Sequence, residues 1–422
     1  MTTGLVQAVA ALKHRNFRIF WTGQIISLIG AWMQSVAQGW LVLQLTDSPL
    51  LLGVVSAVQF TPMLFLSLIA GVAADRLPKR KLLLVTQISS SLTALILGLL
   101  VITGRVCFWH VLILAGILGT INAFDSPTRQ SFIVELVGKK DLMNAIVLNS
   151  TAFNGARIIG PALAGLAIDQ LGMAPCFLIN AASYLAVIYG LLVIRVDDVG
   201  QDREPVRMMG TKIREGLQYI IQTPLILRII VLIIMLSTFS MNFHVLVPVL
   251  ARNTLGLGAQ GYGYLMSAMG VGAIIGAFFL ALVSHLGPQW YIIMGGAVGL
   301  SVFQLLLAFN RSYFLALLLL GFCGLSMLSF VTSVNTTLQL NSPDHLRGRV
   351  MSIYTLVFLG LVPLGSLFSG SISDAGGAPA GLAAAGVVGI ISTAAVFLWE
   401  KHQRTPDERS SYKKWQQEIN RK

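Results

Sequence analysis

A run of charged residues between two apolar segments is the first place where the sequence offers chemistry. Gly71-Val-Ala-Ala-Asp75-Arg76-Leu-Pro-Lys-Arg80-Lys81 places one acid among four bases. The Asp75 carboxylate can sit at the N-terminus of another helix, where the helix dipole favours a negative charge. Basic residues alone are enough to fix membrane topology, so the presence of an acid among them indicates a further role. The run therefore predicts a latch between two parts of the chain, and charges that only set topology are the alternative.

Arg157 is the one lysine or arginine that the sequence places within an apolar stretch expected to cross a membrane and not at its inner or outer side. It lies about 14 residues, or about 21 Å, into that stretch. A charge at this depth costs at least about 2.5–3.5 kcal/mol, so the guanidinium should face a cavity or a partner. Two roles stay open. It can anchor an anionic or carbonyl-rich substrate, or it can be structural and bond amides such as Asn154 or Gln34.

Polar side chains on other apolar segments are weaker candidates for a substrate cavity. The first segment carries a polar stripe with helical spacing, which favours either a central aqueous path or hydrogen bonds between helices. His244 can titrate in the physiological range, and Tyr354 can supply an aromatic wall, although both are equally compatible with packing. The stripe consists of Gln24, Ser27, Gln34, Ser35 and Gln38.

Charge scarcity sets the class of protein. Of 422 residues, 55% are hydrophobic and 11% are charged, whereas a soluble domain carries about 25% charged residues. This excludes soluble enzymes, nucleic-acid binders and disordered regulators. The three cysteines are far apart in apolar surroundings, so neither a disulfide framework nor a metal site is expected. No cofactor and no catalytic group are predicted.

Twelve apolar runs are long enough to span a bilayer as helices. The sequence therefore predicts an all-α membrane protein with twelve transmembrane helices in two six-helix halves, since corresponding segments recur in the two halves as in many secondary transporters. The runs cover residues 17–44, 50–74, 82–103, 107–126, 143–169, 174–195, 225–249, 262–284, 289–309, 313–338, 350–373 and 379–400.

Basic residues fix the expected orientation. With alternating loops, only Arg105, Arg252 and Arg311 fall on the outer side and Arg157 within a span, which leaves 25 of the 29 lysines and arginines on the inner side. By the positive-inside rule both termini are cytoplasmic. The net charge of +12 is then a topology signal in a cytoplasmic (inner) membrane protein and implies no nucleic-acid partner.

The longest polar stretch divides the chain. We expect an N-terminal bundle at 1–195, a cytoplasmic linker at 196–224, a C-terminal bundle at 225–400 and a charged tail at 401–422. Apolar residues at helical spacing from Lys212 to Ile221 predict an amphipathic helix along the inner membrane surface. A solvated linker without such a helix is the alternative.

The charged run resembles the signature loop G-x-x-x-D-R-x-G-R-[KR] of the major facilitator superfamily, with Pro78 in place of the usual glycine. The resemblance implies that Asp75 meets the eleventh helix, which would begin near Val350. It also implies that Arg76 or Arg80 pairs with Asp125 at the cytoplasmic end of the fourth helix. Together with Gly71, these residues would form an inner-gate latch.

A second motif lies in the fifth predicted helix, where Ala156-Arg157-Ile-Ile-Gly160-Pro161-Ala-Leu-Ala-Gly165 resembles the antiporter motif G-x-x-x-G-P-x-x-G-G of superfamily exporters. Two of its glycines are alanine here. The resemblance implies export, whereas the alternative is ordinary packing, because small residues four apart let membrane helices approach closely.

Further stretches, such as Asp125-Ser-Pro-Thr-Arg129-Gln, look like the branch that includes the enterobactin exporter and macrolide efflux proteins. This implies a secondary exporter of a bulky amphipathic molecule, a drug, siderophore or similar, working by rocking-bundle alternating access and driven by the proton motive force. Lipid movement between leaflets and uptake by a symporter of the same fold are the alternatives. No phosphate-binding G-x-x-x-x-G-K-[ST] occurs, which argues against an ATP-driven pump. A monomer in the bilayer is expected.

Overall fold

The computed structural model describes residues 10–194, 209–283 and 290–403, and within these ranges the chain forms helices and short connections without a strand. The predicted tail and the first half of the predicted linker therefore lie almost entirely outside the described residues. The helices are η1 (Ala10–Lys13), α2 (Arg15–Thr46), α3 (Pro49–Arg76), α4 (Lys79–Ile102), α5 (Phe108–Leu171), α6 (Ala174–Val193), α7 (Met209–Gln222), α8 (Pro224–Phe239), α9 (Phe243–Val249), η3 (Leu250–Thr254), α10 (Ala259–Val283), α11 (Trp290–Phe309), α12 (Tyr313–Leu340), α13 (Asp344–Gly360) and α14 (Val362–Gln403).

Ten helices among the described residues are long and apolar enough to cross a membrane. Two of these continuous stretches are far longer than a bilayer requires. The 64 residues of α5 would extend about 96 Å as one rod, but Gly138 breaks the helix with φ of 69°. Gly377 breaks α14 in the same way, with φ of 73°. A positive φ is accessible to glycine at little cost, so each long helix turns at its glycine.

The connection predicted at 127–142 is the main difference from the expected boundaries. It is helical except at Gly138, because Phe132 and Leu136 bury their side chains against Phe17 and Phe20 of the first helix. Hydropathy marks only the membrane-embedded part of a helix, and tertiary packing extends it beyond that part.

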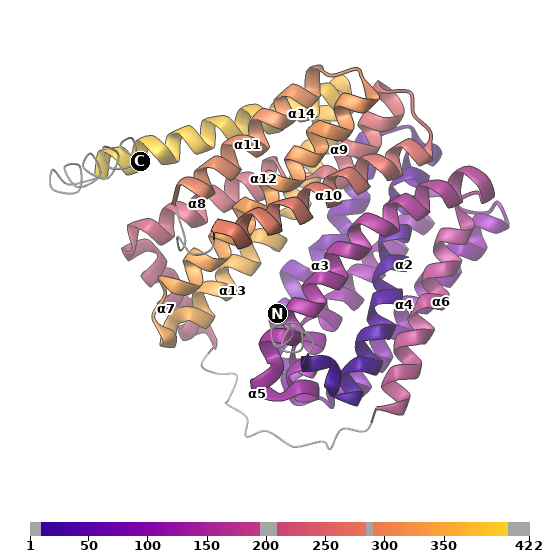
Figure 1. The fold of residues 1–422 in the computed structure, drawn as a ribbon. Coiled ribbons are helices and arrows are strands. Elements are labelled where there is room, and N and C mark those ends of the chain that lie inside the picture. Colours follow the sequence, from indigo (N-terminus) through magenta and orange to yellow (C-terminus); the bar gives the residue numbers. More distant parts are fainter. Residues whose placement is uncertain (1–9, 195–208, 284–289, 404–422) are drawn as a thin grey trace.

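The helices form two groups, α2–α6 and α8–α14, which lie side by side (Figure 1). We call the end where α2 begins the basic end, since Lys79, Arg80, Lys139 and Lys140 lie there, and the opposite end the far end. In Figure 1 the two groups meet toward the far end and diverge toward the basic end. This divergence positions the site described below.

Close packing at the far end joins the two groups. The ring of Trp40 on α2 stacks on that of Tyr262 on α10, with centroids 5.9 Å apart and an angle of 18°. A Cβ on Gly370 of α14 would lie only 2.8 Å from Pro49 O and 3.2 Å from Gly53 Cα. The backbones of α3 and α14 therefore touch, a contact that small residues allow between membrane helices.

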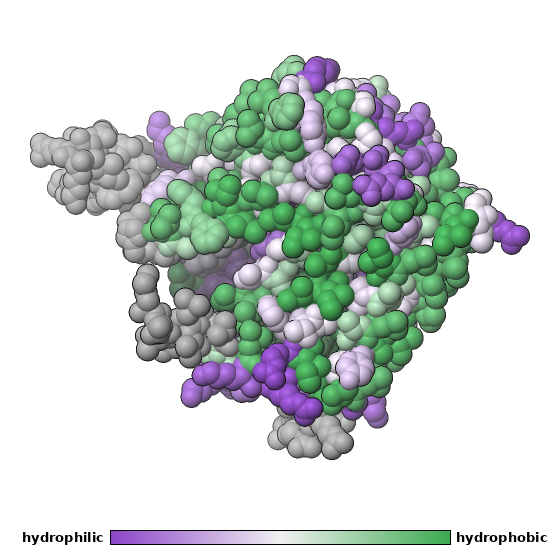
Figure 2. Space-filling view, turned by 45° about the vertical axis from the view of Figure 1, so that its right-hand side comes forward, coloured by the Kyte–Doolittle hydropathy of each residue, from purple (hydrophilic) through white to green (hydrophobic). Residues whose placement is uncertain are grey.

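The outer surface is strongly apolar. Large hydrophobic side chains project outward from many helices, for example Phe278 at 69% exposure and Leu318 at 62%. Figure 2 shows hydrophobic residues over the middle of one face, with hydrophilic residues gathered toward its top and bottom. Exposed apolar area on this scale is unfavourable in water, whereas lipid covers it without cost.

Helix α7 contains the segment 212–221 for which the sequence predicts a helix. It does not stand apart from the bundle. Ile220 is buried and Tyr219 Oη donates a hydrogen bond of 2.8 Å to Asn341 O, while Leu217 and Ile221 are exposed. The exposed apolar pair is compatible with a membrane surface, and that location stays a prediction.

We predict that Gly370→Leu lowers the melting temperature of the purified protein by several degrees. The larger side chain has to part the α3 and α14 backbones, and overpacking of this kind costs about 1–3 kcal/mol. Gly295→Leu is the matched control, because a Cβ there meets nothing within 4 Å. Equal melting temperatures for the two variants would contradict the close contact.

Candidate functional site: a cavity between the two helix groups

A cavity of about 600 Å³ opens between the two groups at the basic end. Its size is within the range of small-molecule sites, about 300–1,000 Å³. Most of its wall is apolar, and Arg349 is the single charged residue among those that line it. It is lined from α3 by Met63, Ser67 and Gly71, from α5 by Ala123, Ser126, Pro127 and Gln130, and from α13 by Gly348, Arg349, Met351, Ser352, Ile353, Thr355, Leu356, Leu359 and Gly360.

The cavity widens from the middle of the molecule toward the basic end. Near its closed end, a Cβ on Gly360 of α13 would lie 2.7 Å from the side chain of Leu64 on α3. At its mouth, Gly71 on α3 and Gly348 on α13 have nothing within 4 Å of a Cβ position. The two walls thus belong to different groups and separate progressively.

The predicted latch residues stand at this mouth without joining its walls. Asp75 and Arg76 are exposed at the end of α3, and no hydrogen bond or ion pair connects them to another described residue. Arg80 donates instead to the backbone oxygens of Leu191 and Leu192, the latter at 2.9 Å. Arg80 therefore ties α4 to α6 within one group and does not pair with Asp125 in this arrangement.

The eleventh predicted helix also begins earlier than expected. α13 begins at Asp344, whose carboxylate pairs with Arg347 at 2.7 Å. Sequence hydropathy marks its start near Val350, because the first turn is polar. Arg349 pairs with Glu215 of α7, so the charged first turns of α13 are held by the linker helix.

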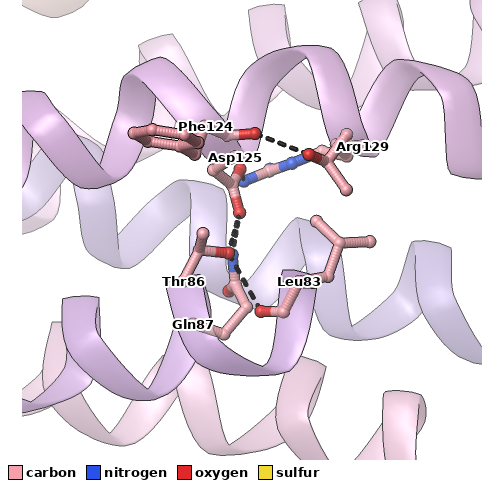
Figure 3. Close-up of polar contacts among 7 residues, drawn as sticks. Leu83, Thr86, Gln87, Phe124, Asp125 and Arg129 are labelled. Carbon is pink, nitrogen blue, oxygen red and sulfur yellow. Dashed lines mark hydrogen bonds and ion pairs between the residues drawn. The ribbon is translucent and has the colours of Figure 1, made fainter. Parts of the chain in front are cut away.

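Asp125 lies deeper than the sequence suggests. The sequence predicts it at the cytoplasmic end of the fourth helix, but the residue is only 3% exposed, between α4 and α5. Its Oδ1 accepts hydrogen bonds from Thr86 Oγ1 at 2.8 Å and Gln87 Nε2 at 2.7 Å, and Arg129 pairs with Oδ2 (Figure 3). Sequence reasoning missed these three partners, although the i, i+4 spacing of Asp125 and Arg129 was a usable signal.

The polar stripe of the first helix faces neighbouring helices inside its own group. Gln34 Oε1 accepts from Asn180 Nδ2 at 2.7 Å, and Gln38 Nε2 donates to Gln59 Oε1 at 2.9 Å. Gln24 is 5% exposed. Hydrogen bonds between helices therefore account for Gln34 and Gln38. Ser35 is exposed and Gln24 Oε1 has no partner among the described residues, so the aqueous path stays a prediction for the rest of the stripe.

Three further cavity candidates are engaged elsewhere. His244 is partly buried where the groups meet, beside Phe60 of α3, with its Nε2 3.0 Å from Ser366 Oγ. Tyr354 is 5% exposed and stacks on Phe358 at a centroid distance of 5.8 Å. Asn154 Nδ2 donates to Ser150 O of its own helix at 2.8 Å. None of the three lines the cavity.

The helix-five motif packs α5 against a helix of each group, α2 and α10. Its small residues, Ala156, Gly160, Pro161 and Gly165, are all buried. A Cβ on Gly160 would lie 3.0 Å from Ile29 O of α2, and one on Gly165 would lie 2.9 Å from Gln260 Cα of α10. Ordinary close packing therefore accounts for the motif's small residues. Arg157, within the same motif, has no such explanation.

Contacts that the sequence did not suggest link the two groups at the far end. Arg252 after α9 pairs with Asp47 after α2 at 3.1 Å and also donates to Leu43 O. Asp374 of α14 accepts from Ser48 Oγ at 2.7 Å and Leu50 N at 3.2 Å. Each acid meets a donor of the opposite group, and Asp374 satisfies one of the free backbone N–H groups at the start of α3, that of Leu50.

Two groups of apolar helices around a cavity open at one end are an architecture that many secondary transporters share. The chain belongs to the transmembrane secretion effector family of the major facilitator superfamily, whose family model matches residues 6–421. Its members are multi-pass membrane transporters, and the resemblance seen in the Asp75 and Pro161 motifs is confirmed.

Its relatives include exporters of different molecules. The chain is 28% identical to the multidrug efflux pump Tap of Mycolicibacterium fortuitum, over 86% of this chain and 90% of that one. It is 29% identical to the staphyloferrin A transporter of Staphylococcus aureus, with coverages of 85% and 89%. The enterobactin exporter EntS of Shigella boydii is 23% identical, and each chain is covered over 81%.

Solved structures support the same fold. A bacterial homolog of the human lysosomal transporter Spinster, crystallised in an inward-facing and unoccupied conformation, superposes with a TM-score of 0.74. It is 13% identical, and the match covers 93% of this chain and 98% of that one. The nucleoside transporter NupG gives a TM-score of 0.73 at 11% identity, over 91% of this chain and 98% of that one.

We predict that Asp125→Ala lowers stability by about 1–3 kcal/mol, because three buried donors lose their acceptor. Adding Arg129→Met should restore part of the loss, since it removes the largest unpaired group. Melting temperatures of the two variants in detergent measure both effects. Additive losses in the double variant would show that the carboxylate and guanidinium do not depend on each other.

We also predict that Arg252→Ala loosens the far end. In a variant with all three cysteines replaced by serine, a cysteine at the buried Val249 reports opening by its labelling with a membrane-impermeant maleimide. The labelling rate should rise several-fold, because the link to Asp47 is lost. Arg311→Ala is the control, since Arg311 bonds only the neighbouring Asn310 O. Equal rates in both variants would refute a closing role for Arg252.

Proposed function

We propose that this protein exports a bulky amphipathic small molecule from the cytoplasm by alternating access, and that the structure is its inward-open arrangement. The single observation that carries the proposal is the cavity of about 600 Å³, open at the basic end and sealed at the far end by contacts between the groups. Relatives that are multidrug and siderophore exporters support this direction of transport.

The orientation and the number of spans belong to the same proposal. The basic end is the cytoplasmic end, because lysine and arginine accumulate on that side of membrane proteins. Gly138 and Gly377 divide the two longest candidate stretches, Phe108–Leu171 and Asp344–His402, into two spans each, which raises ten candidates to twelve crossings. Both termini are then cytoplasmic, and the location is the inner membrane.

Alternation requires the mouth of the cavity to close. Gly71 and Gly348 line opposite walls there, so approach of α3 and α13 would bring the Asp75 carboxylate toward the first turns of α13. A carboxylate is favoured at a helix N-terminus, and these turns also carry Arg347 and Arg349. This contact would stabilise the arrangement in which the inner end is closed and the far end is open.

The energy source is proposed to be the proton motive force. Asp125 lies close to the cavity, since its neighbour Ser126 is part of the wall. Its carboxylate is held by Thr86, Gln87 and Arg129. Protonation would release Arg129 from its charge partner, which connects a proton to the cavity wall without any carboxylate in the cavity itself.

A second candidate function is movement of a lysophospholipid between leaflets. One observation favours it: the cavity wall contains Met63, Met351 and Leu359, together with Leu356, whose side chain is 43% exposed. Such a wall can accommodate an acyl chain. Transport into inverted vesicles separates the two functions, with a panel of siderophores, macrolides and lysolipids measured with and without a proton gradient.

We predict that Asp75→Asn slows export in such vesicles and shifts the protein toward the inward-open arrangement. The neutral side chain loses its attraction to the first turns of α13, so closure becomes less favourable. Accessibility of a cysteine at Ser67, in the cavity wall, measures the shift. Asp169→Asn, an exposed acid near the far end, is the control. Unchanged transport and accessibility in Asp75→Asn would remove the latch.

A further inference from the structure

Arg157 differs from the other partly buried cations. Among the described lysines and arginines that are not exposed, it is the one without a hydrogen bond or ion pair. The others each have a partner: Lys79 pairs with Glu135, Arg80 bonds Leu191 O, Arg129 pairs with Asp125, Arg228 bonds Pro224 O, Arg252 pairs with Asp47 and Arg349 pairs with Glu215.

The packing of α5 shows which way Arg157 faces. Gly160 contacts α2, whereas Ile158 O accepts a 2.7 Å hydrogen bond from Ser267 Oγ of α10. The lipid-facing side carries Ile159 and Leu163, at 46% and 42% exposure. Since successive residues turn by about 100°, Arg157 starts between the α2 face and the α10 face, opposite the lipid. It therefore projects toward the interface of α2 with α10, and it is not among the residues that line the cavity described above.

The depth of Arg157 makes its lack of a partner costly. It lies about 28 Å along the helix from Gly138 and about 21 Å from Leu171, near the middle of the span. A guanidinium has five N–H donors and stays charged. The membrane spans of α5 carry two acids. Asp125 is already satisfied by three partners, and Asp169 lies about 18 Å from Arg157 along the helix. No other described acid pairs with Arg157 either, so a bound molecule can supply the anion.

The surroundings indicate what kind of molecule this is. One turn before Arg157, Phe153 packs edge-to-face against Trp32 of α2, with centroids 5.7 Å apart, and is 47% exposed. An aromatic surface beside a single cation suits an apolar body that carries one oxyanion. A cationic amphiphile would be repelled, because no described acid stands beside Arg157 to offset its charge.

We propose that Arg157 is the anion-binding residue of the transport site, and that the exported amphiphile carries a carboxylate or a phosphate. This rests on the proposed export function. The guanidinium can hold either group through two parallel N–H···O bonds, while the ring of Phe153 contacts the apolar body. The site then recognises charge at Arg157 and little else, which allows apolar bodies of different shapes.

Binding of a fluorescent amphiphile tests the subsite directly. The probe is 11-(dansylamino)undecanoic acid, compared with its methyl ester, on the purified full-length chain in detergent. The wild type should bind the acid at least tenfold more tightly than Arg157→Gln does, while both bind the ester equally. Arg157→Lys should keep part of the preference, because it retains the charge without the fork. Arg105→Gln, an exposed outer arginine, should match the wild type.

Several outcomes would overturn the subsite. The proposal is refuted if Arg157→Gln still binds the acid more tightly than the ester. It is also refuted if the variant loses affinity for the acid and the ester equally, because that indicates a structural role for Arg157. If Arg157→Gln does not fold, the wild type alone still tests the proposal. An anion site is refuted if dodecanoate does not displace the bound probe acid, or if methyl dodecanoate displaces it equally well.

Transport into inverted vesicles distinguishes a small carboxylate from a lipid headgroup as the bound group. It also tests the export proposal and the Arg157 proposal independently. Uptake of dodecanoate but not lysophosphatidylglycerol, lost in Arg157→Gln, assigns a small carboxylate, and the reverse assigns a lipid headgroup. If wild type and Arg157→Gln take up the cation ethidium equally and neither carries an anion, the export proposal holds and the anion subsite is refuted. No uptake of any probe, with acid-selective binding intact, overturns export and leaves the subsite standing.

Discussion

Contact between the two helix groups at the far end is the interaction on which the rest of the structure depends. The α3 and α14 backbones touch at Gly53 and Gly370, and the link from Arg252 to Asp47 lies at the same end. Because the groups are joined there, their separation accumulates toward the basic end, where Gly71 has no neighbour. The cavity is a consequence of this one-sided contact.

The cost of charge in a bilayer organises the remaining polar residues. Among the described residues, partly buried cations are matched by an acid or a backbone oxygen, as in the cluster of Asp125 and Arg129. Amides of α2 are used in the same way to join helices, as Gln34 is with Asn180. Among the partly buried described cations, the unpaired Arg157 is the exception that points to a ligand.

Some of the site could be read from residue order alone. Helix-period spacing places Arg157 in mid-span, and the motifs around Asp75 and Pro161 identify the superfamily. Spacing could not tell that Gln34 and Gln38 face neighbouring helices, since a polar stripe has the same period whether it faces water or an amide. Hydropathy also could not show that Asp125 is buried, because Asp125 lies at the end of its apolar run, next to polar residues.

The sequence by itself determined the class of protein, the apolar spans and the position of its rare charges, because burial in lipid requires long apolar runs whatever their arrangement. Only the tertiary structure decided which polar groups meet. Partners such as Thr86 and Asp125, or Asp374 and Ser48, are far apart in the chain, and their distances follow from helix packing. Packing also decided that Arg157, alone among the partly buried described cations, has no partner among the residues that the structure describes.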